Sequence, residues 1–123
     1  MIKRKIDRYL ADVFVTDKKA LMLTGARQIG KTYSIRRFGH EHFERFIEIN
    51  FIENPGLVNV FSKAKNSQDI LLRLSTVTNQ DLIKGNTLVF FDEVQECPEI
   101  ITAIKFLVEE GSYRYILSGS LLG

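Results

Sequence analysis

A chain of 123 residues, 45% hydrophobic and 26% charged, is long enough for one globular domain with a buried core. The net charge of +2 is too small to indicate nucleic-acid binding, and the sequence contains neither a bilayer-spanning apolar run nor a signal-peptide pattern. The single cysteine, Cys97, cannot form an internal disulfide, and the sequence shows no cluster of metal-ligand residues. These features favour a protein of the reducing cytoplasm.

The N-terminal segment, residues 2–15, predicts an amphipathic helix, because apolar side chains recur at helical spacing with basic residues among them. The simplest interpretation is a helix that packs on a sheet and exposes its basic face. Binding to a membrane surface or to nucleic acid is the alternative. The apolar positions are Ile2, Ile6, Leu10, Val13 and Phe14.

Residues 25–32 carry the pattern G-x-x-x-x-G-K-T, which is typical of a phosphate-binding loop. An apolar run of strand length, residues 19–24, precedes the loop. Residues 31–38 contain neither Gly nor Pro and predict a helix that ends at Gly39. Glycines let phosphates approach the backbone, and the first N–H groups of a helix attract an anion. The expected phosphate-binding residues are Gly25, Ala26, Arg27, Gln28, Ile29, Gly30, Lys31 and Thr32.

Two side chains of this loop have definite expected roles in binding a nucleoside triphosphate with Mg²⁺. Lys31 is a mobile positive charge suited to the β- and γ-phosphates, and the Thr32 hydroxyl suits a magnesium ligand. Arg27 and Gln28 occupy free positions, where they either contact the γ-phosphate or a partner or are simply solvated. No Asn-Lys-x-Asp pattern for reading guanine occurs, which favours ATP over GTP.

The next part of the chain predicts one strand and two helices. Residues 45–51 alternate between apolar and polar side chains and predict an edge strand. Residues 54–56 (Asn-Pro-Gly) predict a turn, and a short helix around residues 57–61 follows. Ser67 is the expected cap of a further helix whose apolar residues are Ile70, Leu71, Leu74 and Val77.

An acidic pair follows the most apolar strand of the sequence. Residues 88–91 predict a strand that is buried on both faces, and Asp92 and Glu93 come directly after it. A magnesium–triphosphate site needs a carboxylate at such a strand end. Asp92 is the candidate magnesium ligand, through water, and Glu93 is the candidate general base for the attacking water. Such a pair is common by itself, and the preceding phosphate loop is what favours this interpretation.

The last segments predict a helix and another core strand. Pro98 suits the first turn of a helix that ends at Gly111, and Cys97 just before it has an expected structural or capping role. Residues 113–120 predict a strand that ends in small polar residues. Ser118 or Ser120 is a candidate γ-phosphate sensor between the two motifs, and an ordinary strand-to-loop turn is the alternative. Alternating strands and helices predict an open α/β sheet with both candidate sites at the carboxyl ends of its strands.

Four motifs in this order resemble the AAA-type (ASCE P-loop) ATPase domain of bacterial and archaeal ATP-binding proteins. The resemblance covers nearly the whole chain, and the loop and acidic pair specify little beyond the ATPase class. The motifs are Gly25-Ala26-Arg27-Gln28, Ile49-Asn50-Phe51, Phe91-Asp92-Glu93-Val94-Gln95 and Leu117-Ser118-Gly119-Ser120.

The resemblance implies a parallel sheet ordered 5-1-4-3-2, in which Ser118-Gly119-Ser120 is a sensor region. It also implies the same roles for Lys31, Thr32, Asp92 and Glu93 as their chemistry suggests. Residues 1–123 would then be the N-terminal part of an AAA-type domain, ending after the fourth core strand. The present strands would be ordered 1-4-3-2, and the first would be an exposed edge, open to pairing with other chains. A C-terminal effector domain would be missing.

The expected function is ATP binding and Mg²⁺-dependent hydrolysis, coupled to a conformational change in a C-terminal or partner domain. The 123-residue chain is expected to bind nucleotide with little turnover, because a second sensor and a trans-acting arginine are missing. One alternative is a nucleotide-regulated assembly module without turnover, as a homo-oligomer or in association with DNA. DNA association rests on family analogy alone. A P-loop small-molecule kinase is less favoured, because it needs an acceptor lid after the fourth strand.

Overall fold

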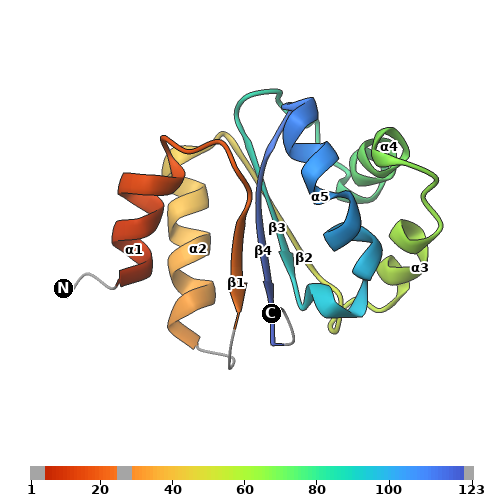
Figure 1. Ribbon diagram of the computed structural model, residues 1–123, viewed down its shortest axis with the longest axis horizontal. Coiled ribbons are helices and arrows are strands. Elements are labelled where there is room, and N and C mark those ends of the chain that lie inside the picture. Colours follow the sequence, from red (N-terminus) through yellow and green to blue (C-terminus); the bar gives the residue numbers. More distant parts are fainter. Residues whose placement is uncertain (1–4, 25–28, 121–123) are drawn as a thin grey trace.

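A parallel sheet lies between two layers of helices in the computed structural model, which describes residues 5–24 and 29–120 (Figure 1). The strands are ordered β1-β4-β3-β2, and each neighbouring pair is parallel. The expected order 1-4-3-2 is therefore confirmed, and β1 and β2 are the edges of the described sheet. The strands are β1 (Leu21–Thr24), β2 (Arg45–Asn50), β3 (Thr87–Asp92) and β4 (Arg114–Gly119).

The helices divide between the two faces of the sheet (Figure 1). One face is covered by α1 (Lys5–Tyr9), the π-helical turn η1 (Leu10–Phe14) and α2 (Ile29–His42). The other is covered by α3 (Gly56–Ser62), α4 (Ser67–Thr78) and α5 (Pro98–Glu110), and a 3₁₀ turn, η2 (Val94–Glu96), joins β3 to α5. None of the helices in the described part of the chain has the length and hydropathy that a bilayer crossing requires.

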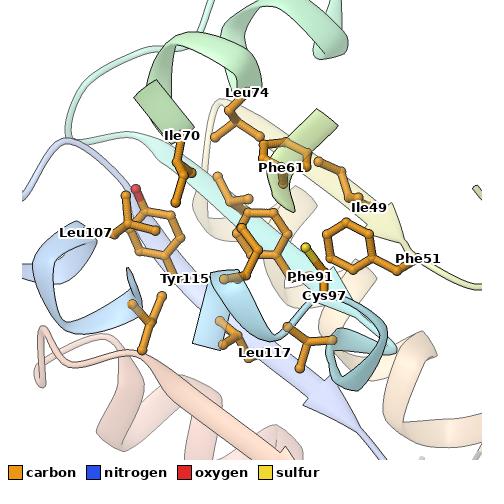
Figure 2. Close-up of a cluster of buried hydrophobic side chains, with 14 of the residues drawn as sticks. Ile49, Phe51, Phe61, Ile70, Leu74, Phe91, Cys97, Leu107, Tyr115 and Leu117 are labelled. Carbon is orange, nitrogen blue, oxygen red and sulfur yellow. The ribbon is translucent and has the colours of Figure 1, made fainter. Parts of the chain in front are cut away.

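The larger of the two hydrophobic clusters fills the space under α3, α4 and α5 (Figure 2). The rings of Phe51, Phe91 and Tyr115 lie parallel in a row, with centroids 6.0 and 6.5 Å apart, and Phe61 meets Phe91 edge-on. Successive side chains of a strand point to opposite faces, so β3 also supplies Leu88 and Phe90 to the cluster under α2. The prediction that this strand is buried on both faces is confirmed.

The N-terminal helix is confirmed for residues 5–14, but its apolar face differs from the expected one. Leu10 and Phe14 are buried, whereas Val13 is 39% exposed. Arg114 on β4 holds the end of this segment, because its guanidinium donates to the backbone carbonyls of Phe14 and Asp17. The same guanidinium lies 4.2 Å from the centroid of the Phe14 ring. The carbonyl of Phe14, the last residue of this helical segment, is satisfied in this way, as is that of Asp17 just beyond it.

Two predicted helix boundaries are wrong. Helix α2 continues past Gly39 to His42, and Gly39 serves close packing, since a Cβ there would lie 2.2 Å from a ring atom of Phe46. The cap of α4 is Asn66 rather than Ser67: Asn66 has extended backbone, and its Oδ1 accepts from the backbone N–H of Asp69 at 2.9 Å. Residue type alone suggested both boundaries. A tertiary contact with Phe46 accounts for Gly39, and a local hydrogen bond makes Asn66 the cap.

Candidate functional site

A small cavity lies where the strands of the sheet end and α2 begins. Its volume is about 150 Å³. The first turn of α2 and the ends of β3 and β4 line it, together with a half-exposed side chain just after β2. The lining residues are Lys31, Thr32, Ile52, Asp92, Glu93, Ser118, Gly119 and Ser120.

The strand order explains why these residues meet. Helix α2 follows β1 and the acidic pair follows β3, and β4 is paired with both strands. The end of β4, residues 118–120, therefore lies between the two predicted motifs. Ser118 is buried there, and Ser120 is exposed one residue beyond the strand. Carboxyl ends of parallel strands are where open α/β sheets bind ligands.

The described structure includes only part of the predicted phosphate loop. Ile29 and Gly30 begin α2, which places Lys31 and Thr32 in its first turn, where backbone N–H groups lack helical partners and the helix dipole is positive. Gly25, Ala26, Arg27 and Gln28 lie outside the described residues. The predictions for these four residues remain predictions.

Asp92 carries a half-buried carboxylate at the end of β3. Burial raises its pKa, and the charges of Glu93 and Glu48 raise it further, while the backbone N–H of Glu93 and the charge of Lys31 oppose this rise. The Glu93 N–H donates to Oδ1 of Asp92 at 2.9 Å. Negative charge is thus gathered in a partly desolvated place, where a cation would be favoured.

Asn50 also contacts Asp92, although the motifs did not single it out as a site residue. Its Oδ1 accepts from the backbone N–H groups of Ile52 and Glu53 at 2.9 and 3.0 Å. These two donors orient the amide, so that Nδ2 faces Oδ2 of Asp92 at a long 3.4 Å. Asn50 ends β2 in register with Asp92 at the end of β3. Its place on the polar side of an edge strand was visible in the sequence, but the pairing register was not.

Glu93 adopts an unusual backbone conformation directly after β3. Its φ of 55° and ψ of 45° lie in the left-handed region, which residues other than glycine rarely occupy. Its Oε1 accepts from Nε2 of Gln95 at 3.2 Å. Left-handed residues persist where their surroundings hold them, and they gather at functional sites. The acidic pair indicated Glu93, whereas neither this backbone conformation nor the contact with Gln95 could be inferred from it.

The donor atoms of the cavity fit a magnesium ion that is shared with a phosphate. Within residues 5–24 and 29–120, no group of three or more His, Cys, Asp or Glu side chains could hold a metal. Thr32 and Asp92 supply one hydroxyl and one carboxylate. Mg²⁺ characteristically takes one or two protein oxygens and completes its shell with water and substrate phosphates. The cavity is also smaller than the ~300 Å³ at which pockets for drug-sized ligands begin, so it suits a phosphate with an ion.

A larger cavity of about 500 Å³ lies elsewhere, between the α3–α4 connection and α5. Apolar groups dominate it, with Ile70, Ala103 and the exposed Phe106 among its lining residues. None of the motif residues within the described part of the chain lines it. Volume alone would select this cavity, but the charged and hydroxyl groups suited to a phosphate are gathered in the smaller one.

We expect Asp92→Asn to stabilise the ligand-free protein at neutral pH by less than about 1 kcal/mol, because solvent screens this partly exposed carboxylate. The folded-state pKa of Asp92 is raised, so the folded state keeps this proton to higher pH than the unfolded chain. Stability is therefore lost as pH rises from about 4 through the folded-state pKa. Asparagine does not ionise, so the variant does not lose this stability as the pH rises. Urea unfolding between about pH 4 and pH 7 measures both effects, and a variant less stable than wild type at pH 7 would contradict the expectation.

Comparison with known proteins relates most of the chain to one protein family. The family model described as "AAA domain" matches residues 17–123. No curated protein sequence matches the chain. Among solved structures, that of C. elegans PCH-2 aligns with a TM-score of 0.56 and 14% sequence identity. The alignment covers 97% of this chain and 37% of the PCH-2 chain, so this chain spans little more than a third of that protein. At this identity the likeness shows the fold alone.

Proposed function

This chain belongs to the AAA-domain family, and from that premise we propose that it binds ATP with Mg²⁺ and hydrolyses it. One observation carries the proposal: a single cavity joins the first turn of α2 to the acidic pair at the end of β3. The first turn of a helix is suited to binding phosphates. An acidic pair at a strand end is suited to holding magnesium and activating a water nucleophile. A single bound nucleotide could therefore contact both the phosphate-binding groups and the acidic pair.

Binding is assigned to the α2 side of the cavity. Lys31 would place a positive charge against the β- and γ-phosphates, and the predicted glycine loop before α2 would supply backbone N–H groups. The Thr32 hydroxyl and the Asp92 carboxylate would hold the magnesium, the latter through water. When bound, the ion neutralises charge that gathers on the phosphate oxygens during the reaction. Asn50 keeps the Asp92 carboxylate in place from the neighbouring strand.

Hydrolysis is assigned to Glu93. Its carboxylate accepts a proton from a water molecule while the water oxygen forms a bond to the γ-phosphorus. The bond from that phosphorus to the β,γ-bridging oxygen breaks, and its electron pair leaves with ADP. Inorganic phosphate is the second product, and the proton on Glu93 passes to it or to solvent. Ser118 and Ser120 lie beside this path at the end of β4 and are proposed to hydrogen-bond the γ-phosphate or the water.

The finer part of the proposal is that hydrolysis changes the conformation of a C-terminal or partner domain. Its support is the position of β4, which runs through the core and ends at the cavity between both motifs. A shift of residues 118–120 on loss of the γ-phosphate would move the end of a core strand. Parts of the protein that contact this end would then respond to the state of the nucleotide.

Calorimetric titration with ATP tests the proposal, with and without a chelator of Mg²⁺. We expect dissociation constants in the range of about 1 μM to 1 mM with magnesium, and clearly weaker binding when it is chelated. AMP is the matched control, since it has the base and the sugar but lacks the phosphates that this cavity would hold. Binding of AMP as tight as that of ATP, or no binding of ATP, would refute the proposal.

A further inference from the structure

Gln95 lies behind the cavity rather than in it. It belongs to η2, and two cavity-lining residues, Glu93 and Gly119, contact its side-chain amide from different strand ends. Nε2 of Gln95 donates to Oε1 of Glu93 at 3.2 Å. On the opposite side, Oε1 of Gln95 lies so close to Gly119 that a Cβ added there would be 2.4 Å from it. The amide is thus held between Glu93 and the end of β4.

Stability alone does not account for a glutamine at this position. Its Oε1 is buried, and no donor among the described residues reaches it. A buried acceptor without a donor costs stability, and a methionine of similar shape would avoid that cost. The amide cannot be turned over profitably, because its oxygen would then face a carboxylate oxygen of Glu93. What the glutamine does provide is an N–H donor aimed at Glu93.

A glycine at position 119 is required by the lack of room for a side chain rather than by the backbone conformation. Among the described glycines, only Gly85 and Gly111 have positive φ, and a side chain at Gly119 would be acceptable on that ground. The obstacle is Gln95, whose Oε1 would lie 2.4 Å from an added Cβ, closer than real Cβ contacts come. A glycine in a strand commonly marks such a close approach. The end of β4 therefore leaves room for the Gln95 amide in this position only because residue 119 has no side chain.

We propose that Gln95 is a positioning residue for Glu93, and that its contact with Gly119 makes the position of Glu93 depend on the end of β4. The inference rests on the proposed role of Glu93 as the base. Glu93 has a left-handed backbone, a conformation that persists where the surroundings hold it, and the bond from Nε2 of Gln95 restricts the orientations of its carboxylate. A base must be held close to its optimum, since a displacement of about 1 Å can cost about 100-fold in rate.

The first test replaces Gln95 with methionine, which keeps the shape and removes the donor. We expect single-turnover ATP hydrolysis, with protein in excess, to slow about tenfold. The dissociation constant of ATP should stay within about twofold, and thermal stability should not fall. Gln68→Met, at an exposed position of α4, is the matched control and should leave all three unchanged. A rate equal to that of wild type would overturn the inference, as would a rate loss fully explained by unfolding.

A second measurement does not depend on ATP. The side-chain amide signals of Gln95 in a ¹⁵N–¹H spectrum can be identified by their loss in Gln95→Met. We expect them to shift in Glu93→Gln, because the carboxylate acceptor is then replaced by an amide oxygen. Unchanged signals would overturn the contact itself. If wild type fails to bind ATP, the proposed function fails while this spectrum still decides the contact between Gln95 and Glu93.

The role of β4 is tested by Gly119→Ala. Its methyl group displaces the Gln95 amide, so we expect the same slowing as in Gln95→Met and no further loss when the two are combined. Two independent defects would instead multiply, and that outcome would overturn the coupling. Should Gly119→Ala fold poorly, Gly119→Ala with Gln95→Ala relieves the clash and should restore stability. Failure to restore it would show that Gly119 is needed for another reason.

Discussion

Replacement of Lys31 by alanine is expected to weaken ATP binding by about 100-fold or more while the protein stays folded. Lys31 lies in the first turn of α2 and lines the cavity that also contains the acidic pair. Burial raises the pKa of Asp92 and the charge of Lys31 opposes that rise, and both residues line the cavity where the proposed magnesium would bind. Without Lys31, the phosphates would face Asp92 and Glu93 with less compensating charge. Titration with a fluorescent ATP analogue measures the loss.

The matched control for this variant is Lys105→Ala. Lys105 is exposed on α5, on the opposite face of the sheet from α2, and its loss changes the net charge by the same amount. We expect unaltered affinity in this control. Equal weakening in both variants would mean that the overall charge governs binding. Affinity of Lys31→Ala equal to that of wild type would remove the phosphate site from this cavity.

Glu93→Gln is expected to leave ATP bound and to slow its hydrolysis by about 100-fold or more. Glutamine has nearly the same shape as glutamate and can still accept a hydrogen bond from Gln95, but it cannot take a proton from water. The chemical step should therefore fail without loss of binding. Single-turnover measurements with excess protein detect even slow chemistry, and the dissociation constant of ATP should stay within about twofold of the wild-type value.

Glu96→Gln controls for the loss of one negative charge near the site. Glu96 is exposed at the end of η2, the turn that follows Glu93, and does not line the cavity. We expect its hydrolysis rate to match that of wild type. A Glu93→Gln variant that hydrolyses ATP at the wild-type rate would exclude Glu93 as the base. Slower hydrolysis together with lost binding would instead assign Glu93 to holding the ligand.

The predictions for Lys31 and Glu93 concern residues that could be identified from the sequence. Lys31 and Glu93 stand in local patterns: a glycine loop between a strand and a helix, and an acidic pair directly after an apolar run. Such patterns depend on neighbours along the chain, and the structure brings both to one cavity. Strand order also followed the resemblance, since the observed order is β1-β4-β3-β2.

Other features of the site depend on contacts between segments that are distant in the sequence. Asn50 meets Asp92 because β2 and β3 pair in one particular register, and Gln95 meets Gly119 because β4 ends beside η2. The prediction that the helix ends at Gly39 was wrong, because the glycine is explained by a distant contact. Phe46 on strand β2 leaves no room for a side chain there. In each case the residue type was visible, but its partner was not.

The sequence by itself determined the alternation of strands and helices, and it placed the predicted phosphate loop and the acidic pair, because spacing and backbone preference act over a few residues. Only the tertiary structure decided that β4 separates the two motifs, that Asn50 orients toward Asp92, and that the Gln95 amide is held between Glu93 and Gly119. Pairing register and side-chain contact are settled by the packing of the whole sheet and its helices. No local pattern contains that information.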